Sequence, residues 1–178
     1  MATAVTADII NAIRPVKGLK QKIWVFNTGT ATLTKTGNLI NNLVKSGAGT
    51  SFTLEGTKDF ADAGYSASVL PNLLTAFVHK LTFDAVLATA VEKANVDKAD
   101  NIFVVVERNG LQTEGCFLAY GISNGLWKKA QDKMANSNNA VSKVSFESEA
   151  GMEEEYSEYV LWLTNYATTL ALLVATES

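Results

Sequence analysis

Alternating apolar and polar positions are the clearest feature of the middle of the chain. From Phe77 to Asp84, one face carries aromatic and aliphatic side chains together with His79, and the other face is mostly polar. A period of two residues is typical of a half-buried β-strand. Ile102 to Val106 is instead an unbroken run of five apolar residues, rich in β-branched types. Such a run predicts a strand that is covered on both faces.

A helical spacing separates these two strands. Leu87, Ala90, Val91 and Ala94 recur at intervals that place them on one side of a helix, with charged residues between them. We therefore expect an amphipathic helix that ends near Asn95 to Lys98 and packs on the following strand. In this interpretation an aspartate at position 91 puts an unpaired charge into the contact and costs several kcal/mol.

Turn signals divide the rest of the chain into further short strands. Asn109-Gly110 and Asn124-Gly125 are strong turn dipeptides. Leu39 to Val44 has helix-like spacing, but its two asparagines and its short length leave a strand open. Thr57 to Asp62 and Lys128 to Asn139 are polar and are expected to be exposed loops. The remaining predicted strands are Lys22–Asn27, Ser51–Leu54, Tyr65–Leu70, Gly115–Tyr120, Val141–Glu149 and Tyr159–Thr164.

These elements predict a mainly β fold, a β-sandwich or β-barrel, with one flanking α-helix. The length of 178 residues and the hydrophobic content of 47% suit a single folded domain over residues 1–178. Thr3 to Ile13 is predicted to be a short helix or an ordered arm, ended by Arg14-Pro15, so residues 1–18 are a candidate N-terminal arm. The apolar stretch Leu170 to Ala175 is far too short to span a membrane.

The charges are distributed unevenly along the chain. Residues 1–54 carry six basic side chains and one acidic one, a net charge of +5, whereas the residues after Lys143 carry seven acidic and no basic ones, a net charge of −7. Two solvated faces are the plainer interpretation. The sharper one is that the two regions attract each other between copies in a ring or stack, or that the acids face a channel. The candidate acidic cluster is Glu147, Glu149, Glu153, Glu154, Glu155 and Glu158, and its candidate basic complement is Arg14, Lys17, Lys20 and Lys22.

Two short motifs invite a catalytic or nucleotide-binding interpretation, and neither is complete. Gly121 to Gly125 reads G-I-S-N-G, which matches the G-x-S-x-G nucleophile elbow. That mechanism needs a histidine later in the chain, but the only histidine, His79, precedes the serine, so a Ser-Asn-Gly hairpin turn is favoured. Gly29 to Thr36 has Thr34 in place of the second glycine of a phosphate-binding loop, which favours a threonine-rich strand and turn.

Metal ligands are equally sparse. With one histidine and one cysteine, Cys116, a zinc site would consist mainly of carboxylates, which zinc does not prefer. His79 lies on an apolar strand face, where a hydrogen-bonded core or interface role is usual. Glu153 to Glu155 lacks the spaced acids and central glycine of a calcium loop. We therefore expect no catalytic residues, no cofactor, no metal and no enzymatic activity, and the single cysteine excludes an internal disulfide.

The order of the predicted elements resembles a known class of virion proteins. An early strand, Ile23 to Phe26, precedes a series of strands, and a long strand then leads into one helix, the buried run and the alternating C-terminal strands. Over residues 20–165 this order resembles the β-barrel or sandwich with a flanking helix of phage tail-tube proteins and their relatives in secretion tubes. The phrases Val144-Ser145-Phe146-Glu147-Ser148 and Gly151-Met152-Glu153 are similar to neck- and tail-ring proteins of tailed phages that infect gut Bacteroidetes, the crAss-like phages.

The resemblance implies a non-enzymatic structural subunit of a phage virion. Such a subunit forms a homo-oligomeric ring or tube in the tail or neck through which DNA passes, and family members often carry a long hairpin for ring contacts. The implied partners are further copies of the chain and other tail or neck proteins, with no sequence-specific DNA binding and no membrane. The implied location is the virion, assembled in the host cytoplasm.

Two alternatives stay open beside this reading of the resemblance. One is a capsid-associated or decoration protein, and the other is a monomeric β-barrel ligand-binding domain. A ring-forming subunit is expected to have edge strands that pair between copies, whereas a binding domain is expected to be monomeric with a defined pocket.

Overall fold

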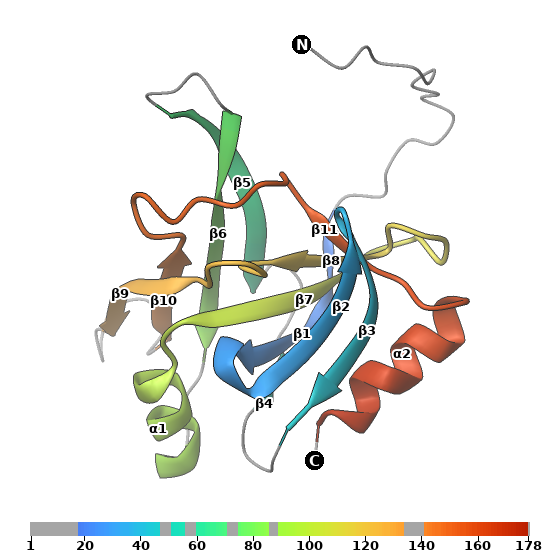
Figure 1. Cartoon of the computed structure of the whole chain (residues 1–178). Helices are drawn as coiled ribbons and strands as arrows, with labels where there is room; N and C mark the ends of the chain where they lie inside the picture. The colour runs from blue at the N-terminus through green and yellow to red at the C-terminus, as the bar shows by residue number, and fades with distance from the viewer. Residues whose placement is uncertain are drawn as a thin grey trace.

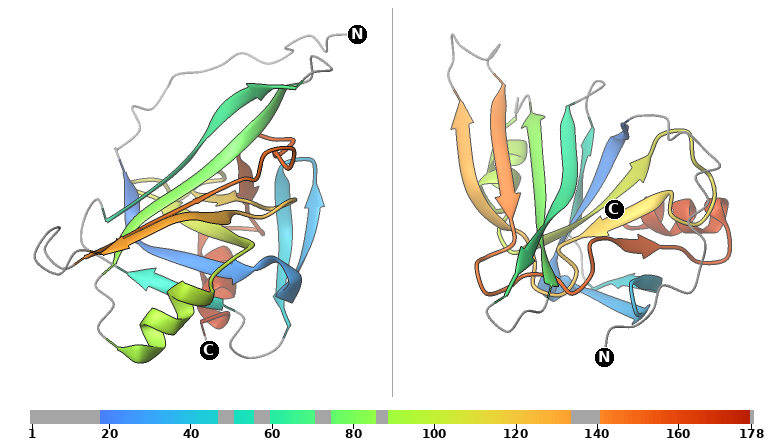
Figure 2. Two further views of the ribbon diagram at one scale, coloured as in Figure 1. Left: turned by 90° about the vertical axis from the view of Figure 1, so that its left-hand side faces the viewer. Right: turned by 90° about the horizontal axis from the view of Figure 1, so that it is seen from above.

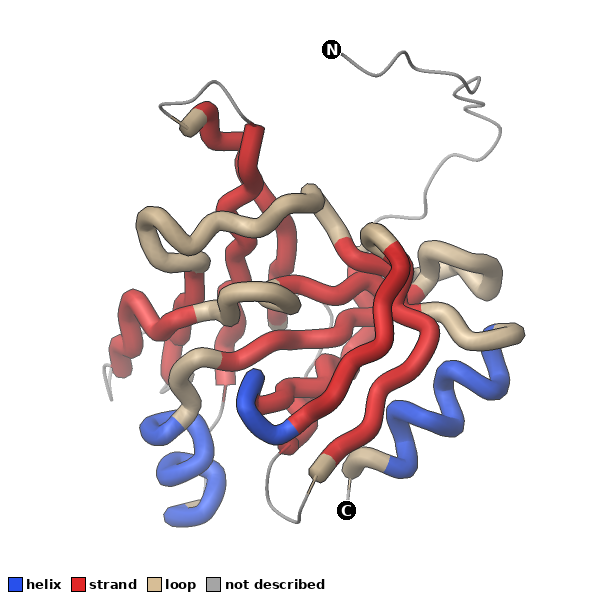
Figure 3. The backbone as a smooth tube through the Cα atoms, in the orientation of Figure 1, coloured by secondary structure: helices blue, strands red, loops and turns tan. Residues whose placement is uncertain are grey.

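The computed structural model describes residues 18–46, 51–55, 60–70, 75–85, 89–133 and 141–177. Within these residues the chain forms two β-sheets and two α-helices (Figure 1). The mainly β fold class is therefore confirmed, and Figure 3 shows how much of the backbone is strand. The elements are β1 (Leu19–Asn27), the 3-10 turn η1 (Thr28–Thr30), β2 (Ala31–Thr36), β3 (Leu39–Lys45), β4 (Ser51–Glu55), β5 (Ala61–Val69), β6 (Thr75–Ala85), α1 (Ala90–Lys98), β7 (Ile102–Arg108), β8 (Phe117–Tyr120), β9 (Trp127–Lys133), β10 (Ser142–Glu147), β11 (Tyr159–Leu161) and α2 (Tyr166–Ala175).

The larger sheet has seven strands in the order β2-β3-β11-β8-β7-β1-β4. Strand β7 lies inside the sheet and pairs antiparallel with β1 and β8. Residues 102–107 of β7 are all buried, which confirms the prediction of a strand covered on both faces. The short strand β11 pairs antiparallel with β8 and parallel with β3, so it ties the C-terminal region to the hairpin of β2 and β3.

The smaller sheet has four antiparallel strands in the order β5-β6-β10-β9. The side chains of β6 alternate as the sequence predicts, with His79, Leu81 and Phe83 buried and Lys80 and Thr82 exposed. Strand β10 alternates in the same way, and its buried positions face the same side. One face of this sheet therefore packs on the molecule and the other is exposed and polar.

Two hydrophobic cores hold the layers together. The first lies between the sheets, where Ile23 and Val104 of the larger sheet belong to one cluster with Leu81 and Phe146 of the smaller sheet. The second lies on the opposite face of the larger sheet and includes Leu173 of α2. Burying side chains of this size stabilises the fold by about 1.5–3 kcal/mol each. The result is a three-layer arrangement of small sheet, large sheet and α2.

The first helix is present, but the predicted packing face is wrong. Helix α1 begins at Ala90 because Thr89 and Glu92 form a capping box, in which the hydroxyl and carboxylate each accept from the other residue's backbone N–H. This start places Val96 in the core, 2% exposed, and leaves Val91 68% exposed. An aspartate at position 91 is therefore expected to be tolerated. Leu87, part of the predicted face, lies outside the described residues.

The C-terminal region also differs from the prediction. The predicted strand Tyr159–Thr164 ends already at Leu161, and a second helix, α2, follows it. The side chain of Asn165 caps this helix by accepting a hydrogen bond from the N–H of Thr168, 2.9 Å away. The prediction of a single flanking helix is thus wrong.

Three segments between the predicted strands are strands themselves. Leu39–Lys45 is strand β3, which resolves the open choice there. Trp127–Lys133 is an edge strand and not a loop; it is polar because both its faces are largely exposed. Ala61 and Asp62 already belong to β5. Phe60 is half-buried at a bend before β5, and the rest of the two predicted loops, residues 57–59 and 134–139, lies outside the described residues.

Neither sheet closes on itself within the described residues. Strands β2 and β4 are the edges of the larger sheet, and β5 and β9 are the edges of the smaller one. The described strands therefore form two stacked open sheets and not a closed barrel. The predicted N-terminal arm falls almost entirely on residues 1–17, which lie outside the described part.

Candidate functional site

A tight loop, residues 121–125, carries the G-x-S-x-G motif. Gly121 and Gly125 have φ angles of +76° and +79°, a region that glycine enters without a steric penalty. A Cβ atom at Gly121 would lie 2.6 Å from Cγ of Leu126 and 3.0 Å from the carbonyl oxygen of Ile102. The turn geometry therefore accounts for both glycines. The loop joins β8 of the larger sheet to β9 of the smaller one, so the prediction of a hairpin turn at this motif is wrong.

The carboxylate of Glu154 holds this loop from inside the molecule. Glu154 is fully buried. It accepts hydrogen bonds from the backbone N–H of Ser123 (3.0 and 3.1 Å) and of Asn124 (3.0 Å), and from the hydroxyl of Tyr159 (3.2 Å). Its own backbone exchanges two hydrogen bonds with Phe77 of β6. A buried carboxylate needs such donors, and these three groups supply them.

His79 holds the same loop from strand β6. Its Nδ1 accepts a hydrogen bond from the N–H of Gly121 (2.9 Å), so the proton of the neutral ring is on Nε2, which donates to the carbonyl oxygen of Tyr156 (2.9 Å). Burial lowers the pKa of His79, and the negative charge of Glu154 offsets only part of that effect. The hydrogen-bonded core role predicted for this histidine is confirmed.

Ser123 lies in a polar cluster, but the loop lacks the donors that acyl transfer requires. Its Oγ accepts from Nζ of Lys35 (2.9 Å) and shares a hydrogen bond with the hydroxyl of Tyr159 (2.9 Å). An oxyanion hole uses the N–H of the residue after the nucleophile. Here the N–H groups of Ser123 and Asn124 both donate to Glu154. The contacts describe a structural joint between the loop, β6 and the segment before β11, which we call the Glu154 joint.

The second incomplete motif is also explained by secondary structure. The stretch from Gly29 to Thr36 forms the end of η1 and strand β2. A phosphate-binding loop leads from a strand into a helix, so the threonine-rich strand and turn of the sequence interpretation is confirmed.

One member of the predicted acidic cluster does not lie at the surface. Glu154 is fully buried, so it cannot contribute to a contact between copies or to a channel wall, and its place in that cluster is wrong. Glu155 is exposed and Glu153 is half-buried. The other three have partners within the chain: Glu147 lies 3.4 Å from Nζ of Lys80, Glu149 lies 3.8 Å from Nζ of Lys129, and Glu158 accepts from the hydroxyl of Tyr120 at 3.0 Å.

The described part of the predicted basic complement is paired within its own chain. Lys20 lies 2.6 Å from Glu107, and that hydrogen bond is the main cause that raises the pKa of Lys20. Lys22 lies 2.8 Å from Glu55 and 2.9 Å from Glu177. Arg14 and Lys17 lie outside the described residues. Two of the six basic side chains of residues 1–54, Lys20 and Lys22, are therefore neutralised locally.

The hairpin of β5 and β6 extends beyond the rest of the molecule (Figures 1 and 2). Near the body, the inner face of this hairpin packs in the core between the sheets. Towards its end the same face continues with Tyr65, Ala67, Val69 and Phe77. Tyr65 is 48% exposed and Val69 is 69% exposed, and the rings of Tyr65 and Phe77 pack edge to face with centroids 5.7 Å apart. We call these four residues the hairpin face.

The two edges of the smaller sheet differ in how they are protected. Exposed edges are usually guarded by charges or proline. Strand β5 is nine residues long and carries only Asp62 as a charged residue, whereas four of the seven residues of β9 are charged. Strand β5 is therefore an unguarded edge next to the hairpin face.

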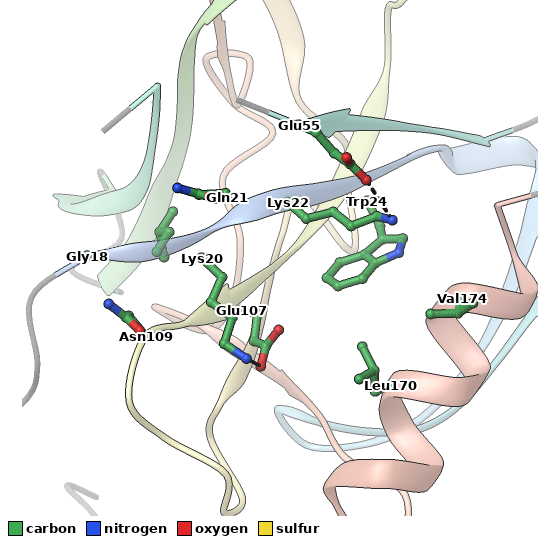
Figure 4. Close-up of a pocket in the computed structure, with 11 residues that line it drawn as sticks. Gly18, Lys20, Gln21, Lys22, Trp24, Glu55, Glu107, Asn109, Leu170 and Val174 are labelled. Carbon is green, nitrogen blue, oxygen red and sulfur yellow. Dashed lines mark ion pairs between the residues drawn. The ribbon is translucent and has the colours of Figure 1, made fainter. Parts of the chain in front are cut away.

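A groove lies on the other side of the large sheet, between β1 and α2 (Figure 4). Its volume is about 560 Å³, within the range of ligand sites. Trp24, Leu170 and Val174 give it apolar walls, and the ion pairs of Lys20 and Lys22 lie along its floor. The remaining lining residues are Gly18, Leu19, Gln21, Glu55, Glu107 and Asn109. We call this the α2 groove.

Comparison with known proteins does not indicate a function, because no protein family, no curated protein and no solved structure matches this chain. Within the described residues, no group of three or more histidine, cysteine, aspartate or glutamate side chains is arranged to hold a metal ion. The described helices are all too short or too polar to cross a membrane.

Proposed function

We propose that this protein is a non-enzymatic structural subunit of a phage virion, which forms a homo-oligomeric ring or tube in the tail or neck through which DNA passes. The observation that carries the proposal is the hairpin face, which lies uncovered beside the unguarded edge of β5. Apolar side chains that a folded chain leaves uncovered beside an open sheet edge indicate a contact with another chain. The tail-tube character of the fold remains part of this proposal.

The two edges of the small sheet suit a head-to-tail contact. An unpaired strand offers a row of N–H and C=O groups, and β5 of one copy can pair with β9 of the next because both are edges of the same sheet. A head-to-tail contact of this kind uses two different surfaces of each copy, and its repetition gives a ring when the rotation between copies closes and an open helical stack when it does not. The hairpin of β5 and β6 then takes the role of the ring-contact hairpin expected from the resemblance.

The exposed face of the small sheet suits the passage of DNA. Where β6 pairs with β10, its side chains are polar and carry two lysines and two acids: Lys80, Thr82, Asp84, Lys143, Ser145 and Glu147. Lys80 and Glu147 are paired across the strands. Binding to phosphate backbones requires an excess of positive charge. A wall with balanced charge lets DNA pass without holding it and without reading its sequence.

Sedimentation of the purified chain tests this proposal. The parent is expected to form closed oligomers, and Val69→Lys, which places a charge on the hairpin face, is expected to fold but to stay monomeric. The matched control is Val91→Lys, because Val91 is equally exposed at 68% but lies on α1. It should assemble like the parent.

A second candidate function is favoured by the α2 groove, namely a monomeric domain that binds a ligand. A parent chain that is monomeric at every concentration and salt condition would refute the ring and support this alternative. Equal assembly of Val69→Lys and Val91→Lys would leave a ring but remove the hairpin face from its contacts. A capsid-associated or decoration protein is another form of the proposal, in which the oligomer binds to the capsid shell.

A further inference from the structure

Gly64, in the middle of the edge strand β5, is a glycine that the described fold does not require. Its φ angle lies outside the left-handed region that favours glycine, and a Cβ atom built on it would meet nothing within 4 Å. Glycine inside a strand is less stable than alanine by about 0.5–1 kcal/mol. Such a glycine often marks a place where another group approaches the strand closely. At Gly64 this combination points to a group that approaches when copies assemble.

Trp127 lies at the opposite edge of the same sheet, in the same row of residues. Gly64 pairs with Lys80, Lys80 pairs with Glu147, and Glu147 pairs with Trp127. Residues that pair directly across strands point to the same face, so the half-buried ring of Trp127 lies on the polar face with Lys80 and Glu147. This row therefore has a glycine at the β5 edge and a tryptophan at the β9 edge, on the two sides of the sheet in Figure 1.

The strand directions allow the two edges to meet as an ordinary antiparallel pair. Each of the three pairings in the small sheet is antiparallel, so its outer strands β5 and β9 run in opposite directions. Copies related by rotation about an axis along the strands keep their strand directions. Strand β9 of one copy then meets β5 of the next antiparallel, and the sheet continues between copies with the pairing that it has within one copy.

Shape and charge select the same register for this pair. Antiparallel pairing of Trp127 with Gly64 of the next copy brings Lys129 opposite Asp62, which is the only charged residue of β5. Nζ of Lys129 lies 3.8 Å from Glu149 in its own chain, and an ammonium group has three N–H donors, so it can also reach a second carboxylate. A shift of two residues in either direction places a side chain against the ring of Trp127 and separates Asp62 from Lys129.

We infer that Trp127 of one copy packs over Gly64 of the next and fixes the register of the contact between β9 and β5. This inference rests on the proposed ring. An aromatic side chain that covers a glycine on the neighbouring strand supplies the packing that the glycine lacks. Because Trp127 is the first residue of β9, the part of β5 after Gly64 extends past the paired strands. The hairpin face therefore contacts the neighbouring copy through its side chains and not through strand pairing.

Sedimentation of the full chain with a side chain added at Gly64 tests this packing. Gly64→Val is expected to raise the dissociation constant of assembly at least tenfold, because the valine displaces the ring of Trp127. The chain itself is expected to fold, since the added Cβ has free space. The matched control is Ser66→Val, at the next position on the same face of β5, which should assemble like the parent. Gly64→Val/Trp127→Ala should assemble no more weakly than Trp127→Ala, because no ring remains to be displaced.

Disulfide trapping tests the register directly. In Asp62→Cys/Lys129→Cys the two cysteines of one chain lie on opposite edges of a four-stranded sheet, about 14 Å apart, which is too far for a disulfide within the chain. Disulfides between copies are expected to form at least tenfold faster than in Ser66→Cys/Lys129→Cys, where the register places the partners about 13 Å apart. The natural Cys116 does not interfere, because it is fully buried and burial raises its pKa to about 11.

The outcomes separate this inference from the ring on which it rests. Oligomers that cross-link faster through the Asp62 pair and are weakened by Gly64→Val support the inference. Oligomers that cross-link equally through both pairs, or that tolerate Gly64→Val as well as Ser66→Val, leave the ring in place and overturn the packing of Trp127 on Gly64. A parent chain that is monomeric under every condition refutes the proposed ring, and this inference with it.

Discussion

The Glu154 joint and the hairpin face are opposite cases of burial, because the joint buries a charged group and the hairpin face exposes apolar ones. At the joint a carboxylate is completely buried, whereas at the hairpin face Tyr65, Ala67 and Val69 are exposed and Phe77 is half-buried. The joint tolerates its charge because three donors within the chain, the N–H groups of Ser123 and Asn124 and the hydroxyl of Tyr159, form hydrogen bonds to the carboxylate. The exposed apolar side chains of the hairpin face are not covered by other described residues. The joint is therefore expected to serve folding and the hairpin face to serve assembly.

The largest expected effect comes from removing the carboxylate of the joint. Glu154→Ala leaves the N–H groups of Ser123 and Asn124 and the hydroxyl of Tyr159 buried without an acceptor, which is expected to cost about 3–5 kcal/mol of unfolding free energy. Urea denaturation of the monomer measures this cost.

The control for this substitution lies at the next residue. Glu155 is exposed, and Glu155→Ala should change the unfolding free energy by less than about 0.5 kcal/mol. The comparison with the hairpin face is completed by Val69→Lys, which is expected to affect assembly and not monomer stability. Equal stabilities of the two glutamate variants would contradict the buried role of Glu154.

The sequence could predict the alternating strands but not the joint. In β6 and β7 the apolar pattern alone determines which side chains are buried, because burial of apolar surface is the dominant favourable term in folding. Glu153, Glu154 and Glu155 are chemically identical, and only tertiary contacts choose the middle one for burial. His79 was identifiable as a core residue because it shares a face with aromatic neighbours.

The helices show the same division between local and tertiary signals. The capping box of Thr89 and Glu92 is visible in the sequence and fixes the start of α1, so the packing face could have been found by counting from that cap. Helix α2 was missed because an apolar stretch without charges has no amphipathic period to reveal it. Strand β9 was not predicted because an edge strand whose two faces are both exposed to solvent has the composition of a loop.

An intermediate effect is expected in how the stability of the fold depends on pH, through His79 in the joint. Because the pKa of His79 is lowered in the folded state, below pH 6.5 the unfolded chain binds a proton that the folded chain does not. Stability is therefore expected to fall as the pH decreases below 6.5, by up to about 1.4 kcal/mol per pH unit, until the lowered pKa is reached. At higher pH His79 is neutral in both states and contributes no pH dependence.

Denaturation curves between pH 5 and pH 8 measure this effect. Glu154 and Glu158 are the charged groups that act on His79, and both favour its protonated form. The control is His79→Gln, which removes the titrating ring. Its stability should change less between pH 7.5 and pH 5.5 than that of the parent. A parent curve that is flat over this interval, or parallel to that of the variant, would exclude His79 as a pH-sensitive part of the joint.

The smallest expected effect concerns the surface charges and belongs to the assembly side of the comparison. With Glu154 assigned to the joint, the acidic positions that remain available for contacts between copies are Glu153 and Glu155. If they attract basic groups of a neighbouring copy, Glu153→Gln/Glu155→Gln should weaken assembly severalfold at low salt and leave it unchanged at high salt, because exposed ion pairs contribute only about 0.2–1 kcal/mol each and are screened. If the acids face the channel instead, the variant should assemble like the parent at both salt concentrations.

Sedimentation of the two proteins at low and high salt distinguishes these arrangements, with Glu114→Gln as a control at an exposed acid in the loop after β7. Weaker assembly of the control to the same degree would show that net charge, and not a contact made by Glu153 and Glu155, governs association.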